Sequence, residues 1–221
     1  MNKKVEIIPA ILPKDFDEVE TKISLVKDFV KTVQIDICDG QFTPQASWPY
    51  KKKDSSFEAI LKEEIGMPFW QNLDFEFDLM VNKPEEIVED WIIAGAKRIV
   101  LHTDFEKAVE ILSGRVELGL AIEIDSPLET ILPYADKVQF IQCMGIDNVG
   151  FQGQHFDAKV IDKIKEIRKV LPEMIISVDG GVSLENSQDL ISAGTSRLVV
   201  GSAIFNSDNF IETLEKFKRI L

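Results

Sequence analysis

The sequence predicts an α/β protein of the (β/α)8 barrel (TIM barrel) class, and two observations lead to this prediction. Along the 221 residues, short runs rich in apolar and β-branched residues alternate about eight times with amphipathic or loop segments. Parallel strands joined by helices produce this alternation. No Ser/Gly-rich linker or low-complexity stretch divides the chain, so we expect a single barrel domain over residues 1–221.

The expected strands have the length and composition of buried parallel strands. Taken in chain order, they cover residues 5–12, 32–38, 73–80, 97–102, 115–124, 137–144, 174–179 and 196–200.

Helices are expected where apolar residues recur at helical spacing. Residues 15–30 carry such a stripe, and residues 84–94 open with Pro84 followed by two glutamates, a favourable first turn. Residues 157–171 and 207–221 are also periodic. The glycine turns that follow the last two strands lead into further helical segments.

Composition and charge exclude several classes of function. Hydrophobic residues make up 45% of the chain and charged residues 29%, which is typical of a folded globular domain rather than a disordered one. The formal net charge of −13 argues against nucleic acid or an anionic membrane as the main partner. The first ten residues hold too short an apolar run for a signal peptide, and no stretch reaches the roughly 20 apolar residues of a membrane span.

The chain has two cysteines, Cys38 and Cys143. They cannot form a disulfide framework, so we interpret them as small buried hydrophobic residues and expect a cytoplasmic protein.

The two-residue period of a strand separates the faces of the barrel wall. In residues 32–38 the apolar set points outward and leaves Gln34, Asp36 and Cys38 inward. In residues 73–80 the inward set is entirely acidic: Asp74, Glu76 and Asp78. His102 and Glu123 are also expected inward, whereas no inward lysine or arginine is evident. Such an acidic interior needs either a cation or protonated carboxyl groups.

Two glycine turns predict a phosphate site. One is VDGGV (178–182) at the end of the seventh strand, and the other is VVGSAIF (199–205) at the end of the eighth. Glycine lets backbone N–H groups approach an anion, and phosphate sites after strands seven and eight are common in barrels. A third segment, GFQGQHF (150–156), is expected to lie over that phosphate.

Asp36 and Asp179 end inward-facing strands on opposite sides of the barrel mouth. Two carboxyl groups that flank a bound sugar can remove a proton from one face and return it to the other. The pair therefore indicates acid–base inversion of a carbon next to a carbonyl group, a reaction whose enediolate needs a metal or positioned donors.

Over nearly its whole length the chain resembles the ribulose-phosphate 3-epimerases. The segments that carry the resemblance are IIPAILPKDF (7–16), QIDICDGQFTP (34–44), DLMVNKPE (78–85), GFQGQHF, VDGGV and VGSAIF. The resemblance implies a ribulose-phosphate-binding barrel that inverts carbon 3 of a ketopentose phosphate through two aspartates and a divalent metal. It assigns the aspartates to Asp36 and Asp179, and phosphate binding to Gly153, Gly180, Gly181, Gly201 and Ser202. It also implies that the chain forms homo-oligomers.

The chain departs from the family pattern where the family holds its metal. The two histidine positions carry Gln34 and Asp78. Further family positions carry Ala10, Cys38, Gln41 and Glu123. An oxygen ligand set favours Mg²⁺ or Mn²⁺ over Zn²⁺. We therefore expect a weak divalent site formed by Asp36, Asp78 and Asp179 with Gln34 assisting.

Several interpretations stay open at this point. The leading function is epimerisation of ribulose 5-phosphate or a similar ketose phosphate. The alternatives are a related phosphosugar isomerase and a non-catalytic phosphosugar-binding protein that has lost the metal site. The second loop, with Trp48, Tyr50 and Lys51–Lys53, is either a lid over the substrate or a solvated excursion.

Overall fold

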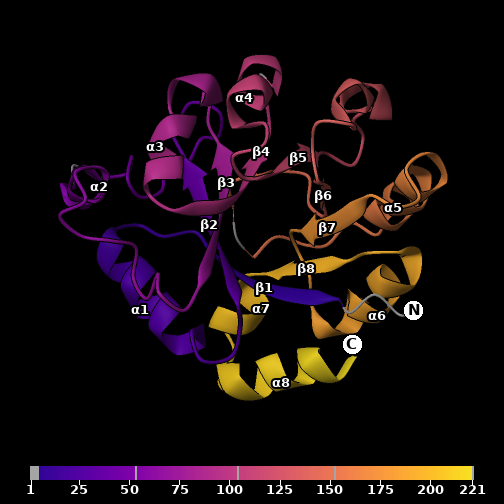
Figure 1. Cartoon of the computed structure of the whole chain (residues 1–221). Helices are drawn as coiled ribbons and strands as arrows, with labels where there is room; N and C mark the ends of the chain where they lie inside the picture. The colour runs from indigo at the N-terminus through magenta and orange to yellow at the C-terminus, as the bar shows by residue number, and fades with distance from the viewer. Residues whose placement is uncertain (1–4, 53, 104, 152, 221) are drawn as a thin grey trace.

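The computed structural model describes residues 5–52, 54–103, 105–151 and 153–220. Lys53, Gln152 and Leu221, which belong to the second loop, the glycine loop and the expected last helix, lie outside the described residues. Eight parallel strands, β1 to β8, close into a barrel in chain order (Figure 1). The expected fold class is therefore confirmed.

Each observed strand overlaps its expected range; β5 and β6 begin two and three residues later than expected, and β4 begins one residue earlier. Their bounds are β1 Glu6–Ile11, β2 Thr32–Cys38, β3 Asp74–Met80, β4 Ala96–Leu101, β5 Glu117–Ile122, β6 Phe140–Met144, β7 Ile175–Asp179 and β8 Arg197–Val200. Most of their residues are buried, as expected for strands covered on one side by helices and on the other by the barrel interior.

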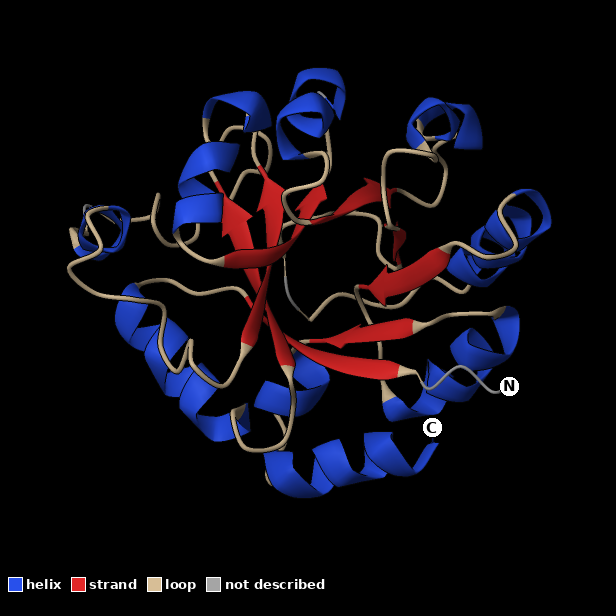
Figure 2. Ribbon diagram, viewed as in Figure 1, coloured by secondary structure: helices blue, strands red, loops and turns tan. Residues whose placement is uncertain are grey.

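Helices surround the barrel (Figure 2). The α-helices are α1 Phe16–Val26, α2 Ser56–Leu61, α3 Val88–Ile93, α4 Phe105–Leu112, α5 Lys159–Val170, α6 Leu184–Ala193, α7 Ser202–Phe205 and α8 Phe210–Ile220. The first is capped by Asp15, whose carboxylate accepts a hydrogen bond from the Glu18 amide.

Two connections differ from the expected helices. Residues 84–94 split into a 3₁₀ turn, η1 Pro84–Glu86, followed by the short helix α3. The connection after β5 has two 3₁₀ turns, η2 Leu128–Thr130 and η3 Leu132–Tyr134, and no α-helix. Pro127 and Pro133 flank or interrupt these turns, and proline removes an N–H group from the interior of a helix.

The outward faces of the strands form the main core with the helices. Phe77 and Trp91 are fully buried, and their rings lie 4.6 Å apart between β3 and α3. Trp48 is 1% exposed and packs on Phe16, Phe57 and Trp91. The second loop is therefore anchored in the core at Trp48, whereas Tyr50 is 41% exposed.

The barrel interior is filled by side chains of unequal size. Gly119 on β5 faces Phe140 on β6, and a Cβ atom on Gly119 would lie 2.3 Å from the phenyl ring. Phe140 thus occupies the space that a side chain at position 119 would fill.

The expectation that no basic side chain points inward was wrong. Arg98 on β4 donates to Glu6 and Glu117, and its Nη1 lies 3.6 Å from Glu76 Oε2. Arg197 on β8 is buried and pairs with Glu6 and Glu117. Both arginines lie near the N-terminal ends of their strands, so part of the interior acidity is compensated there, away from the barrel mouth.

Candidate active site

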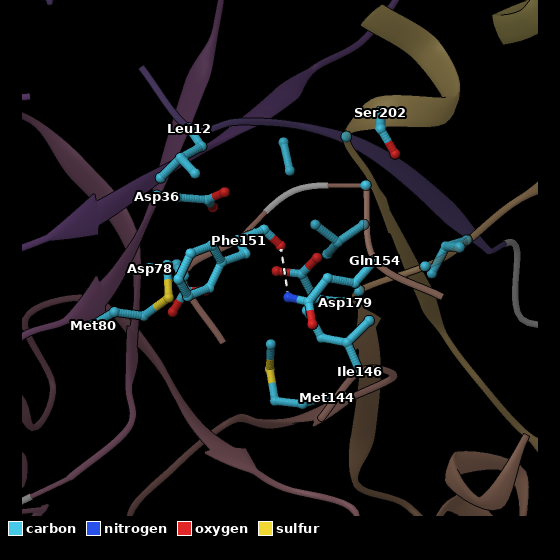
Figure 3. A pocket seen from close by; sticks show the side chains of 18 residues that line it. Leu12, Asp36, Asp78, Met80, Met144, Ile146, Phe151, Gln154, Asp179 and Ser202 are labelled. Atoms are coloured by element: carbon cyan, nitrogen blue, oxygen red, sulfur yellow. Dashed lines mark hydrogen bonds between the residues drawn. The ribbon is translucent and has the colours of Figure 1, made fainter. Parts of the chain in front are cut away.

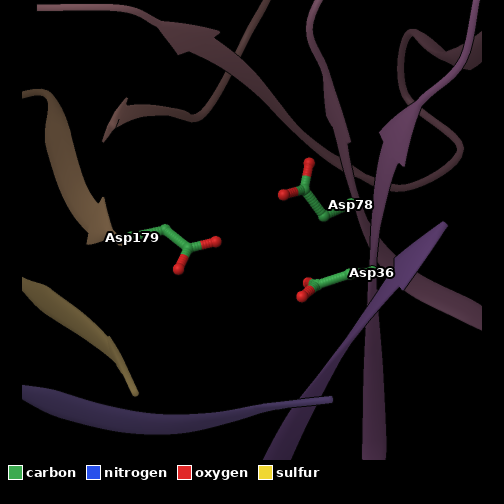
Figure 4. Close-up of side chains that lie close together, drawn as sticks. All are labelled: Asp36, Asp78 and Asp179. Carbon is green, nitrogen blue, oxygen red and sulfur yellow. The ribbon is translucent and has the colours of Figure 1, made fainter. Parts of the chain in front are cut away.

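Three carboxyl groups converge at the C-terminal end of the barrel (Figure 4). Asp36 and Asp78 are register partners in the β2–β3 ladder, so they leave neighbouring strands side by side. Asp179, the last residue of β7, faces them from the other side of the barrel. One oxygen from each of the three lies within 4.8 Å of the others. This is the arrangement of three ligands around one metal ion or of acid–base groups around one small molecule.

Two glutamine amides hold these carboxyl groups. Gln34 Nε2 donates to Asp36 Oδ1 and to Asp179 Oδ2, both at 2.8 Å. Gln142 Nε2, from β6, donates to Asp78 Oδ2 at 3.2 Å and to Asp179 Oδ2 at 3.5 Å. Both glutamines are fully buried. The amides therefore bridge carboxyl groups that would otherwise repel each other.

His102, directly after β4, contacts one of the three carboxyl groups. Its Nε2 lies 2.6 Å from Asp78 Oδ1, and its side chain is 2% exposed. Burial alone lowers the pKa of His102, but the charge of Asp78 and the hydrogen bond to it outweigh burial and raise that pKa above 6.5. The imidazole thus fixes the orientation of Asp78.

Burial raises the pKa values of the inward acids. Burial, followed by the charges of Asp179 and Asp78, raises the pKa of Asp36 well above 3.8. Burial and then the charge of Asp78 raise the pKa of Asp179 to about 7. Two such groups near neutral pH can exist as one acid and one base, which is the state that proton transfer between faces requires.

A pocket opens over the carboxyl groups (Figure 3). Its lining includes Asp36, Asp78 and Asp179 together with all the glycines and the serine expected to bind phosphate: Gly153, Gly180, Gly181, Gly201 and Ser202. Phe151 and Gln154 from the third glycine segment also line it. The expected acid–base groups and the expected phosphate turns therefore share one pocket, whose remaining walls are largely apolar.

The VDGGV turn needs its glycines. Gly180 and Gly181 have φ values of 99° and 67°, and a Cβ atom on Gly181 would lie 2.8 Å from the backbone of Phe156. Asn186, in the first turn of α6, donates to the Gly181 carbonyl and accepts from the Ser183 amide. The helix thus fixes the turn at the edge of the pocket.

The expected site residues come together with two exceptions. Gln34 lies beneath the pocket and reaches it only through its hydrogen bonds to Asp36 and Asp179. Glu123, expected inward, lies one residue beyond β5, is exposed, and lines a separate hollow with His102. Cys38 and Cys143 are buried and free, as expected.

Sequence reasoning missed Gln142. It is an isolated polar residue in the otherwise apolar run FIQCM, two residues from the inward Phe140 and Met144. The alternation of strand faces, applied to this run, places Gln142 on the inward face.

The model of the ribulose-phosphate 3 epimerase family matches residues 6–205. The chain belongs to this family. A ribulose-phosphate 3-epimerase of a Synechocystis species is 28% identical, with 97% of this chain and 93% of the relative covered. The Escherichia coli K12 ribulose-phosphate 3-epimerase is 27% identical, with 98% of this chain and 96% of the relative covered.

Solved structures show the same fold at lower identity. The 3-hexulose-6-phosphate synthase of Salmonella typhimurium superposes with a TM-score of 0.70 at 17% identity, covering 98% of each chain. The KGPDC of Streptococcus mutans gives a TM-score of 0.72 at 12% identity, covering 98% of this chain and 96% of that one.

The residues present fit an oxygen-preferring divalent cation. The three carboxylates supply oxygen ligands within 4.8 Å of one another, and the Gln34 side-chain amide lies beside two of them. Oxygen donors of this kind suit Mg²⁺ or Mn²⁺ better than Zn²⁺. Separately, none of the helices in the described part of the chain is long and apolar enough to span a membrane.

Proposed function

We propose that this member of the family is an epimerase that inverts carbon 3 of a ketose phosphate, with ribulose 5-phosphate as the first substrate to test. The observation that carries the proposal is that Asp36 and Asp179 face one pocket from opposite walls, and that this pocket is also lined by the glycine turns after β7 and β8. A small phosphosugar held by its phosphate at the turns would place its carbon chain between the two carboxyl groups.

In the proposed reaction one of the two aspartates acts as base and the other as acid. The ionised carboxylate takes the proton from carbon 3, and the C–H electron pair becomes the double bond between carbons 2 and 3. The former carbonyl oxygen at carbon 2 then carries negative charge. The protonated carboxyl group returns a proton to carbon 3 on the opposite face, which inverts the configuration.

In the cation-free site, burial raises the pKa values of Asp36 and Asp179, so that one of the two groups can hold a proton while the other is ionised. Reaction in the reverse direction exchanges the roles, so neither aspartate is fixed as the acid.

Asp36, Asp78 and Asp179, with Gln34 assisting, would hold a Mg²⁺ or Mn²⁺ ion. When bound, such a cation stabilises the negative charge that develops on the substrate oxygens. His102 keeps Asp78 Oδ1 occupied, so Asp78 presents its other oxygen to the cluster.

The phosphate of the substrate would be bound by backbone N–H groups of Gly153, Gly180, Gly181, Gly201 and Ser202 and by the Ser202 hydroxyl, all at the edge of the pocket. We expect a cytoplasmic enzyme, in keeping with its two buried free cysteines.

One experiment tests the proposal. Ribulose 5-phosphate and, separately, allulose 6-phosphate are incubated with the protein in deuterium oxide, with and without Mn²⁺, and the product is analysed by NMR. Deuterium at carbon 3 with inverted configuration is the expected result. Exchange at another carbon would instead indicate an isomerase, and binding without any exchange would indicate a non-catalytic phosphosugar-binding protein.

A further inference from the structure

Below the three carboxyl groups, several buried oxygens face the barrel interior without a hydrogen-bond partner among the described residues, although Glu76 Oε2 has an ion-pair contact at 3.6 Å with Arg98 Nη1. They are Gln34 Oε1, Gln142 Oε1, both oxygens of Glu76 and Ser177 Oγ. All four side chains are fully buried. An unsatisfied buried polar atom costs roughly 1–3 kcal/mol, so a cluster of them calls for an explanation.

The orientation of the Gln34 and Gln142 side-chain amides accounts for two of these unpaired oxygens. Each points its Nε2 at two carboxyl groups and leaves its Oε1 unpaired. A half-turn of the terminal amide exchanges the two atoms at almost no change in shape. The carbonyl oxygens would then point at the carboxyl groups, a position that is favourable only with a cation between them.

The same half-turn would point the amide nitrogens away from the carboxyl groups, where the neighbouring strands carry inward-facing oxygens. Gln34 is the register partner of Glu76 in the β2–β3 ladder, and Gln142 is the register partner of Ser177 in the β6–β7 ladder. The unpaired oxygens of Glu76 and Ser177 therefore belong to the inward-facing neighbours of the two amides. One rearrangement would provide partners for the whole group of unpaired oxygens.

The distances fit this arrangement. Mg²⁺ binds oxygen ligands at about 2.1 Å in an octahedron, so adjacent ligands lie about 3.0 Å apart. The terminal amide nitrogen of Gln34 lies 2.8 Å from the nearest oxygens of Asp36 and Asp179. That of Gln142 lies 3.2 Å from Asp78 and 3.5 Å from Asp179. Both amides already occupy positions suited to ligands adjacent to the carboxylates.

We infer that Gln142 is a further ligand of the divalent cation, and that its amide and that of Gln34 turn from donors to the carboxyl groups into oxygen ligands when the cation binds. This inference rests on the cation of the proposed function. It would give the cation five protein oxygens, from Asp36, Asp78, Asp179, Gln34 and Gln142, and an octahedral ion would then take one further oxygen ligand.

The test measures Mn²⁺ affinity by calorimetry on chelator-treated protein, with wild type compared against two substitutions of Gln142. Gln142→Met removes both amide atoms at nearly constant length, and we expect Mn²⁺ affinity to fall about tenfold or more. Gln142→Glu keeps an oxygen and loses the N–H donors, and we expect affinity at least equal to that of wild type. If the amide acted only as a donor that competes with the cation, both substitutions would strengthen Mn²⁺ binding.

The matched control is Gln139→Met, just before β6, where the side chain accepts a hydrogen bond from the Leu118 amide away from the carboxyl groups. It should leave Mn²⁺ affinity unchanged. If Gln142→Met does not fold, as judged by circular dichroism, Gln142→Asn retracts the amide by one methylene and carries the same expectation.

Unchanged or tighter Mn²⁺ binding by the methionine variant overturns the inference, as does the absence of Mn²⁺ binding to wild type at millimolar concentration. The proposed function is tested separately, by deuterium exchange at carbon 3. Wild-type protein that binds Mn²⁺ but shows no such exchange would refute the epimerase activity and leave the ligand role of Gln142 standing.

Discussion

Asp36 and Asp78 are direct partners in the β2–β3 ladder, so two acidic side chains leave adjacent strands toward the same point. Like charges in this position repel each other, and the repulsion grows when water is excluded. The structure offsets it with hydrogen bonds, from Gln34 to Asp36 and from His102 and Gln142 to Asp78. The predictions below follow from this arrangement and from the elements that support it.

The acid–base roles predict the effect of Asp179→Asn. An amide of nearly the same shape keeps the pocket but cannot exchange a proton with carbon 3. We expect deuterium exchange at carbon 3 to fall by at least about 10²–10⁴-fold, while phosphosugar affinity changes little. Asp162→Asn on the exposed face of α5 is the control and should leave both quantities unchanged. Exchange at the wild-type rate in the Asp179 variant would remove that residue from the mechanism.

The phosphate turn predicts a contrast between two glycines. Gly181 and Gly114 both have positive φ values, 67° and 74°, so alanine at either position should cost about 1 kcal/mol of stability. Only at Gly181 would the new Cβ atom meet backbone, since nothing lies within 4 Å of a Cβ atom on Gly114. We expect Gly181→Ala to weaken phosphosugar binding tenfold or more (about 1.4 kcal/mol). Equal affinities of the two variants in a calorimetric titration would contradict the assigned phosphate site.

The ligand set predicts metal preference. Gln34→His together with Asp78→His restores imidazole at the two positions where the family pattern has histidine. Because imidazole suits Zn²⁺ and carboxylates suit Mn²⁺, the ratio of Zn²⁺ to Mn²⁺ affinity should rise by about tenfold or more. Competition titrations on chelator-treated wild type and variant measure this ratio. A ratio that stays constant would mean that these two side chains do not contact the ion.

The interior ion pairs predict a pH-dependent stability. Burial alone raises the pKa of Glu117, but Arg197 and then Arg98 outweigh it and hold that pKa below 4.5. A lowered carboxyl pKa contributes stability above the unfolded value of about 4.3, and this contribution is lost as the pH falls through the folded-state pKa.

Glu117→Gln should therefore reduce the free energy of unfolding at pH 7 by roughly 2–4 kcal/mol, and by much less near pH 3. Urea denaturation at the two pH values measures the difference. Glu89→Gln, which breaks the exposed bridge to Arg115, is the control and should leave the free energy of unfolding almost unchanged at either pH. A cost for Glu117→Gln that does not change with pH would show that charge is not its cause.

The strands could be predicted closely from the sequence, because most are short apolar runs and β3 alternates acidic and apolar residues. The connections were harder to predict. Residues 128–134 form two 3₁₀ turns and no α-helix, since Pro133 removes a backbone N–H group there. The expected helix over 84–94 also begins as a 3₁₀ turn, although Pro84 at its start is compatible with an α-helix. The spacing of apolar residues alone does not show where a 3₁₀ turn replaces an α-helix.

The candidate site was predictable where topology alone brings residues together. Closure of the barrel places the ends of β2, β3 and β7 around one pocket, so Asp36, Asp78 and Asp179 meet as expected. Gln142 was missed because it is an isolated polar residue in an apolar run, where composition gives no sign of a site. Arg98 and Arg197 were missed as inward residues because they lie in the N-terminal halves of strands whose later residues are apolar.

Gly119 and Phe140 have a consequence for the way this sequence can change over time. Because a methyl group at position 119 would overlap the phenyl ring, Gly119→Ala is tolerated only after residue 140 has become smaller. A smaller residue at 140 alone leaves a void beside Arg197, whose guanidinium lies 4.8 Å from the ring centre. The two positions should therefore vary together among descendants of this protein, and the order of the two substitutions decides whether the intermediate is strained or under-packed.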